Sequence, residues 1–119
     1  MHSYSFEKLN VWKDSLELVK LIYKVTKGFP SDEKYGLISQ MKRSSVSVSS
    51  NIAEGSTRKT DKNQSHFYSM AYGSLIELLN QLIIREQLHF ISKNELDSLR
   101  LEIDKVANKL NALQKSRIR

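Results

Sequence analysis

Cysteine is absent from this 119-residue chain, and the two residues that most often interrupt helices are scarce, with one proline and four glycines. Without cysteine the protein has no disulfide and no thiolate metal site, which fits a reducing compartment. Few proline and glycine residues, together with leucines at regular spacing, are typical of an all-helical protein. The composition therefore favours an all-α fold before any motif is considered.

The sequence also lacks a long apolar run and the pattern of a secretory signal. The longest apolar candidate, residues 75–84, is interrupted by Glu77, Asn80 and Gln81, so it is too polar for a membrane span. Residues 1–7 do not show the basic and then apolar pattern of a signal peptide. We therefore expect a cytoplasmic protein with no membrane partner.

Recognisable catalytic and metal-binding motifs are missing as well. The histidines have no second histidine or carboxylate at ligand spacing, and neither a glycine-rich phosphate loop nor a nucleophile elbow is present. Glu54 and Glu77 could converge between two helices and act as a hydrolytic acid–base pair, although structural hydrogen bonding is the favoured role. We therefore predict a protein that is not an enzyme and that has no metal site and no cofactor.

Apolar residues recur at intervals of three and four along most of the chain, which is the period of an amphipathic helix. Residues 92–95 have the sequence of a capping box, while Asn10, Ser31 and Asp61 are expected N-caps. These signals predict four helices, over residues of about 10–28, 32–55, 61–88 and 93–115. Helices of this length with short connections pack as an antiparallel, up-and-down four-helix bundle, so we expect residues 1–119 to form a single domain.

The stretch from Gln40 to Gly55 is rich in small polar residues, which are mediocre helix formers. One helical stripe there is mostly apolar, and the stripe beside it is polar, consisting of Gln40, Ser44, Ser47, Asn51 and Glu54. We interpret the stretch as a buried helix whose small side chains allow a neighbouring helix to come close. Its polar stripe then needs hydrogen-bond partners from other helices or from another subunit.

The third helix contains the expected partners for this polar stripe. Gly73 and Ser74 lie near its middle, where a glycine costs up to about 1 kcal/mol relative to alanine, so close approach to the second helix would explain the glycine. We hypothesise a hydrogen-bonded structural motif composed of Gln40, Ser47, Asn51, Glu54, Gly55, Gly73, Ser74 and Glu77. The buried face of the third helix is predicted to be Phe67, Met70, Ala71, Ser74, Leu75, Leu78, Leu82 and Ile83.

Basic residues exceed acidic ones, and the formal net charge is +6. Such an excess is compatible with binding to a polyanion, but a solvated, solubilising surface is an equally good explanation. The main candidates for phosphate contacts are Arg43, Arg58, Lys59 and Lys62, and the secondary ones are Lys42, Arg117 and Arg119. Contacts of this kind would confer affinity for RNA or DNA with little sequence preference.

Several short motifs occur in a fixed order between residues 6 and 91. They are Leu9-x-Val11-Trp12, Phe29-Pro30, Glu33-x-Tyr35-Gly36-Leu37, Gln40-Met41-x-Arg43, Ser47-x-x-x-Asn51-Ile52-Ala53-Glu54-Gly55 and Gly73-Ser74-Leu75-x-Glu77-Leu78. In this order the chain resembles the bacterial four-helix-bundle family of proteins encoded in intervening sequences of large-subunit ribosomal RNA genes. Related members include the accessory variability determinant of diversity-generating retroelements.

The resemblance implies an antiparallel four-helix bundle that assembles into a ring-shaped homopentamer. The retroelement members of that family are associated with RNA or DNA and with a reverse transcriptase, which makes both possible partners here. The residues themselves also favour self-association, because the first helix has two adjacent apolar stripes. Tyr68, Tyr72 and Ile76 moreover lie outside the main predicted face of the third helix.

Taken together, these observations predict a non-enzymatic, homo-oligomeric helical bundle that binds the backbone of RNA or DNA through basic surface. The main alternative is a protein-interaction scaffold, bound to a reverse transcriptase or another protein, whose basic charge is incidental. A hydrolase that uses Glu54 or Glu77 is the third possibility.

Overall fold

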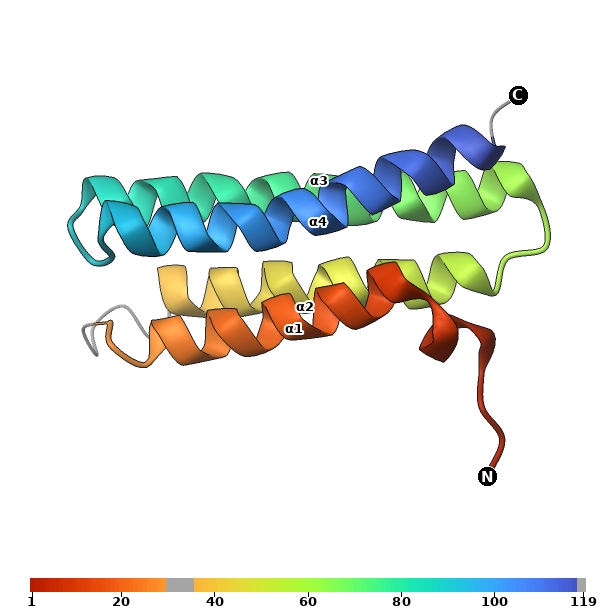
Figure 1. Cartoon of the computed structure of the whole chain (residues 1–119), viewed down its shortest axis with the longest axis horizontal. Coiled ribbons are helices and arrows are strands. Elements are labelled where there is room, and N and C mark those ends of the chain that lie inside the picture. Colours follow the sequence, from red (N-terminus) through yellow and green to blue (C-terminus); the bar gives the residue numbers. More distant parts are fainter. Residues whose placement is uncertain (30–35, 118–119) are drawn as a thin grey trace.

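The computed structural model describes residues 1–29 and 36–117, and this part of the chain consists of helices joined by short connections (Figure 1). A short 3-10 helix, η1 (Ser5–Lys8), is followed by four long helices: α1 (Asn10–Thr26), α2 (Leu37–Ser56), α3 (Asp61–Gln87) and α4 (Lys93–Arg117). Successive long helices run in opposite directions, and the described residues contain no strand. The predicted all-α class with four helices is confirmed.

The capping box predicted at the start of α4 is confirmed. The backbone N–H of Ser92 donates to Glu95 Oε1 at 3.0 Å, and the N–H of Glu95 donates to Ser92 Oγ at 3.1 Å. The predicted N-cap at Ser31 and the helical residues from 32 to 35 lie outside the described residues, and α2 is described from Leu37.

Asn10 and Asp61 are not N-caps, since each is the first residue of its helix. At α1 the turn of η1 comes directly before the helix, so Leu9 takes the cap position and its N–H donates to the Phe6 carbonyl. At α3 the cap is Thr60, whose hydroxyl accepts the N–H of Asn63 at 3.1 Å. Both predictions therefore placed the cap one residue too late.

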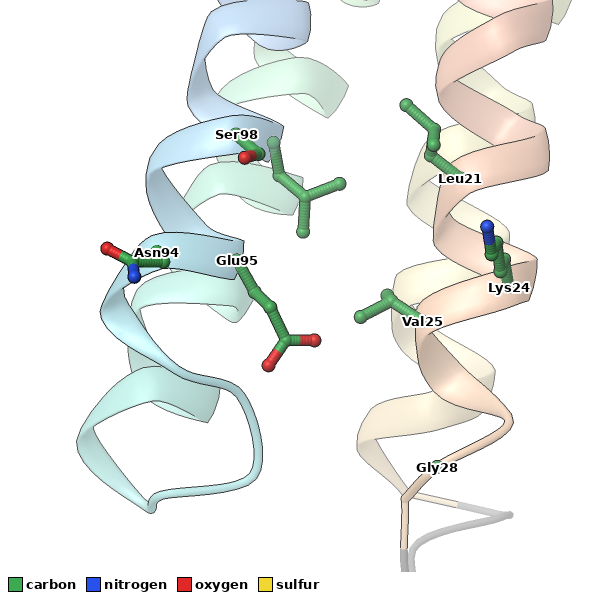
Figure 2. Close-up of a pocket in the computed structure, with 8 residues that line it drawn as sticks. Leu21, Lys24, Val25, Gly28, Asn94, Glu95 and Ser98 are labelled. Carbon is green, nitrogen blue, oxygen red and sulfur yellow. The ribbon is translucent and has the colours of Figure 1, made fainter.

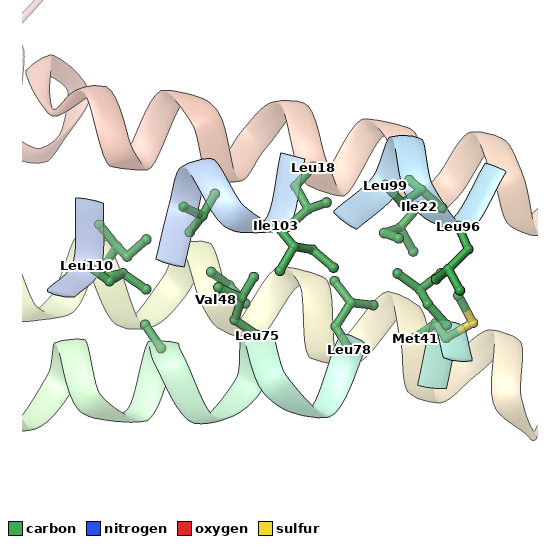
Figure 3. Packing of buried hydrophobic residues seen from close by; sticks show 14 of the residues in the cluster. Leu18, Ile22, Met41, Val48, Leu75, Leu78, Leu96, Leu99, Ile103 and Leu110 are labelled. Carbon is green, nitrogen blue, oxygen red and sulfur yellow. The ribbon is translucent and has the colours of Figure 1, made fainter. Parts of the chain in front are cut away.

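The core runs along the axis of the bundle, and each long helix contributes one apolar stripe to it (Figure 3). In α4 the apolar stripe is buried at Leu96, Leu99, Ile103, Val106 and Leu110. It faces α1 and α2 side chains that are fully or almost fully buried, which are Leu18, Ile22, Met41, Val48 and Ile52. Truncating one such side chain to alanine typically costs about 2–5 kcal/mol of stability.

The buried stripe of α3 differs from the predicted one chiefly in its N-terminal half, and the predicted Ser74 and Ile83 are only partly buried. Tyr68 is 1% exposed and belongs to the core, whereas Met70 is 38% exposed, and Phe67 is only partly buried. The actual stripe, Tyr68, Ala71, Leu75, Leu78 and Leu82, keeps spacings of three and four. The prediction that Tyr68 lies outside the main face is therefore wrong, since the spacing from Leu75 through Ala71 carries the buried stripe to Tyr68.

Arg85 continues the same stripe and is fully buried, with 0% of its surface exposed. Its guanidinium carbon lies 5.1 Å from the centre of the Phe29 ring and 5.2 Å from that of Phe90. Phe29 follows α1 and Phe90 lies between α3 and α4, so the arginine joins two connections at one end of the bundle. Its burial was not predicted, although its position three residues after Leu82 fits the period of the stripe.

Candidate nucleic-acid interface

Four of the predicted basic residues lie at one end of the bundle. Arg58, Lys59 and Lys62 belong to the connection between α2 and α3 and to the first turn of α3, and Arg117 is the last residue of α4. In Figure 1 this connection and the end of α4 lie at the same end, on the right, near the N-terminus. We call Arg58, Lys59, Lys62 and Arg117 the basic end.

The Arg58 side chain contacts residues of both α2 and α3 and remains exposed. Its Nη2 lies 3.6 Å from Glu54 Oε2, and its guanidinium carbon lies 4.5 Å from the centre of the Phe67 ring. The side chains of both ionic partners are largely exposed, so the pair contributes little to stability. The position follows from the end of α2, where the hydroxyls of Ser56 and Thr57 donate to backbone carbonyls at 2.7 Å.

Lys59 and Lys62 are exposed, and neither has a carboxylate partner among the described residues. Their charges are therefore available to an anion from outside. Exposed lysines on a short connection reorient freely, which suits contacts to backbone phosphates rather than to particular bases.

Arg117 is tied to the start of α3 through Gln64, a residue that the sequence analysis did not single out. Its Nε donates to Gln64 Oε1, and the amide Nε2 of Gln64 donates to the Arg58 carbonyl at 2.9 Å. The guanidinium carbon of Arg117 also lies 5.4 Å from the centre of the Tyr68 ring. One amide thus connects two predicted arginines that are far apart in the sequence.

Lys42 and Arg43 lie on α2, away from the basic end. Twelve helical residues separate Arg43 from Gly55, which corresponds to about 18 Å. Lys42 Nζ lies 4.7 Å from the centre of the Tyr23 ring on α1, and Arg43 is exposed. The structure therefore does not join them to the basic end, and Arg119 lies outside the described residues.

A hollow of about 190 Å³ opens at the basic end. It is lined by Ser5, Leu9, Ser56, Gln64, Tyr68 and Arg117. Burial raises the pKa of the Tyr68 hydroxyl, and the nearby charge of Arg117 lowers it in part. The phenol is therefore protonated at neutral pH and can donate a hydrogen bond into the hollow.

The predicted contact between the small polar residues of α2 and α3 is present at its centre. Ser47 Oγ and Ser74 Oγ lie 2.9 Å apart, so the two helices share a hydrogen bond there. Asn51 Nδ2 donates to the Ser47 carbonyl at 2.9 Å and reaches Ser47 Oγ at 3.2 Å. The bonds of Asn51 thus stay within α2, and Gln40 at the other end of the polar stripe is exposed.

The glutamates of the polar motif do not meet, so the acid–base pair is contradicted. Ser47 lies opposite Ser74, and Gly55 lies against Phe67, so the register places Glu54 beside the first turns of α3. Glu77 is about ten residues further along α3, which corresponds to roughly 15 Å. Glu77 is exposed and accepts a hydrogen bond from Gln81 Nε2 on its own helix at 3.3 Å.

The glycine that allows close approach of α2 and α3 is Gly55 and not Gly73. A Cβ atom on Gly55 would lie 2.9 Å from Phe67 Cβ and 2.9 Å from Tyr68 Cε1, which is shorter than real contacts. Gly73 is exposed, and a Cβ atom there would have no atom within 4 Å. The prediction for Gly73 is therefore wrong, since it faces outward on α3.

A larger hollow, of about 540 Å³, lies between α1 and α4 towards the opposite end of the bundle (Figure 2). Leu21 and Val25 line it from α1, and Asn94, Glu95 and Ser98 line it from α4. The Glu95 carboxylate already accepts the N–H of Ser92, so its role is that of a cap. No group of three or more metal-ligating side chains occurs among the described residues.

A search for membrane spans found no helix of sufficient length and apolarity in the part of the chain that the structure describes.

Comparison with known proteins identifies the family of the chain. A family model described as 23S rRNA-intervening sequence protein matches residues 7–112. The fold matches the crystal structure, at 1.70 Å resolution, of a protein with unknown function from the S23 ribosomal protein family of Bacteroides thetaiotaomicron VPI-5482. That match has a TM-score of 0.81 and 20% sequence identity, and it covers 88% of this chain and 98% of the other. No curated protein matches the chain.

Proposed function

The chain belongs to the 23S rRNA-intervening sequence protein family, and we propose that it is a cytoplasmic, non-enzymatic protein that binds RNA through the basic end. The family resemblance drawn from the sequence is thereby confirmed, while the relation to the retroelement determinant stays a prediction. The name of the family supports an association with RNA, and the chemistry of the surface supports contacts to the phosphate backbone.

The observation that carries this proposal is the meeting of four cations from two distant segments at one end of the bundle. Only Arg58 among them has a carboxylate partner in the described part of the chain, and that pair is exposed. Counterions released from phosphates would supply most of the binding energy, so the interaction should be weakly sequence-dependent. Lys42 and Arg43 on α2 are secondary contacts for a longer strand.

We also propose that the protein forms a ring-shaped homo-oligomer, a homopentamer if it follows the family pattern. The support is the outer face of α3, where Ile76 is 44% exposed beside the exposed Gly73. A glycine within an exposed helix costs about 1 kcal/mol relative to alanine, and no described residue lies close enough to Gly73 to require a glycine there. Close packing of a second copy would supply a reason for the glycine, and a ring would present several basic ends to one strand.

A salt titration of RNA binding tests the main proposal. Filter binding of single-stranded RNA to the wild-type protein at two salt concentrations should show a steep loss of affinity as salt rises. Each phosphate contact contributes about 0.7 to the logarithmic slope for a single strand. The double substitution Arg58→Ala with Lys59→Ala should make the slope less steep. If the protein is a ring with one basic end in each subunit, the decrease should exceed the value for two phosphate contacts.

A matched control removes the same charge elsewhere. Lys93 and Arg100 are exposed on α4, outside the basic end, so Lys93→Ala with Arg100→Ala should leave the slope nearly unchanged. Helicity and assembly should be preserved in both double variants. If both variants lose the same affinity, net charge and not the basic end determines binding. Absence of any binding at physiological salt would favour the alternative function, a scaffold for a reverse transcriptase or another protein.

A further inference from the structure

The hollow at the basic end combines hydrogen-bond donors with a positive charge in a space that four segments enclose. Ser5 comes from η1, Ser56 from the end of α2, Gln64 and Tyr68 from α3, and Arg117 from the end of α4. We propose that this hollow binds the terminal phosphate monoester of a nucleic-acid strand. The inference rests on the proposed function and adds to it a site for the end of the strand.

Donors in the hollow are left without acceptors by the rest of the described chain. Arg117 uses Nε for Gln64 and Nη1 for the Leu113 carbonyl at 3.3 Å and for Ser116 Oγ at 2.8 Å. No described residue accepts a hydrogen bond from Arg117 Nη2, from the Tyr68 hydroxyl or from the Ser5 hydroxyl. All three residues line the hollow that an anion would occupy.

The charge of Arg117 is fixed in place but not neutralised. Gln64 and the Leu113 carbonyl hold the guanidinium, and the face of the Tyr68 ring supports it. No described carboxylate pairs with it, and Glu54 near the end of α2 pairs with Arg58 instead. The two N–H groups of Nη2 stay available on this positioned cation, and hydrogen bonds from a charged arginine to phosphate are roughly twice as strong as neutral ones.

The size of the hollow selects a phosphate group over a nucleotide. About 190 Å³ corresponds to roughly six water molecules at 30 Å³ each, which is enough for one phosphate with some remaining water. Small-molecule pockets usually begin near 300 Å³, so a base and a sugar would have to remain outside. If an internal phosphodiester were bound, the strand would have to leave the hollow on both sides of it. A terminal phosphate is joined to the strand on one side only, so the strand needs a single exit.

Charge favours the terminal group as well. A phosphate monoester carries a charge of about −1.5 to −2 at neutral pH, while each internal phosphodiester carries a single negative charge.

Three internally labelled RNA strands of one sequence test the inference: one with a 5′-phosphate, one with a 3′-phosphate and one with hydroxyls at both ends. Fluorescence anisotropy at constant ionic strength should show that one phosphate-ended strand binds about tenfold tighter than the hydroxyl-ended strand, as charge-assisted hydrogen bonds suggest. The strand with the higher affinity shows whether the hollow binds the 5′ or the 3′ end. Inorganic phosphate should reduce the tenfold preference at concentrations that leave the hydroxyl-ended strand bound.

Substitutions in the hollow separate its role from that of the surrounding charge. Tyr68→Phe retains the ring that packs on Gly55 and loses only the hydroxyl, so the preference should fall to about threefold or less. Arg117→Gln should bring the preference close to one. Lys115→Gln, which removes a charge two residues away and outside the hollow, should retain it.

The two proposals fail in different ways. Equal affinity of all three strands for the wild-type protein overturns the terminal-phosphate site and leaves the backbone proposal intact. Retention of the full preference by Arg117→Gln also overturns it. If Arg58→Ala with Lys59→Ala leaves the hydroxyl-ended strand bound as before, the backbone proposal fails while the preference still reports on the hollow.

Discussion

The two ends of the bundle use the same interaction for different purposes. At one end Arg85 packs against the neighbouring rings of Phe29 and Phe90 and is fully buried. At the other, Arg58 lies over Phe67 and Arg117 over Tyr68, and both arginines reach the surface. The arginine on aromatic rings therefore packs in the protein interior at one end of the bundle, whereas at the other end such arginines are accessible to an anion.

Desolvation explains the difference. A buried charge is costly unless it is paired and packed, so removing a buried arginine disturbs everything arranged around it. An exposed arginine keeps most of its hydration, and its surface ion pair contributes between about 0 and 1 kcal/mol. The basic end can therefore exchange its intramolecular contacts for phosphate contacts at little cost in stability, and the opposite end cannot.

The largest expected effect would come from removing Arg85. Arg85→Ala should lower the free energy of unfolding by about 2–5 kcal/mol, because it leaves a cavity beside the two rings on which the side chain packs. Arg58→Ala is the matched control and should change stability by no more than about 1 kcal/mol. Urea denaturation followed by circular dichroism measures both. Equal losses in the two variants would contradict the contrast between the ends.

Gly55 supports the basic end from beneath, because Tyr68 and Phe67 pack directly on it. Gly55→Ala should lower the free energy of unfolding by about 1–3 kcal/mol through overpacking. It should also weaken RNA binding, since the displaced rings carry Arg58 and Arg117. Thermal denaturation and filter binding of the same variant measure the two effects.

Gly73→Ala provides the opposite test on the same pair of helices. In a single chain the substitution should stabilise α3 by about 1 kcal/mol, because a Cβ atom meets no neighbour there. If α3 packs on a second copy, the same methyl group should weaken assembly, which sedimentation at several concentrations would reveal. Stabilisation with unchanged assembly would place the oligomer contact on another face.

The smallest expected effect concerns the dependence of stability on pH. Burial raises the pKa of Tyr68 above its ordinary value of 10.0, partly offset by Arg117. Below pH 10.0 the tyrosine is protonated in both the folded and the unfolded state. Above pH 10.0 the unfolded state releases the proton first, so folding becomes less favourable as pH rises. Wild-type stability should therefore fall between pH values of about 9 and 11 by more than that of Tyr68→Phe.

Tyr4→Phe is the control for this measurement, because Tyr4 is exposed near the N-terminus. It should show the same fall as the wild type. If Tyr68→Phe and the wild type lose stability in parallel, the Tyr68 hydroxyl is solvated, and it would not be a fixed donor at the basic end.

The class of the fold could be predicted because helix formation depends on short-range order in the sequence. The stripe from Leu96 to Leu110 and the capping box at Ser92 involve residues within one or two turns of one another, and the structure contains both. The candidate cations Arg58, Lys59 and Lys62 could be selected for the same reason, since they surround one short connection.

The remaining features depend on how the helices are placed against one another. Gly55 and Gly73 look alike in the sequence, and only the register of α2 on α3 decides that one is covered and the other exposed. The same register separates Glu54 from Glu77 and allows Gln64 to join Arg117 to Arg58. Local periodicity thus determined which residues form helices, while the packing of whole side-chain stripes decided which residues meet, because a contact between helices is set by many side chains at once.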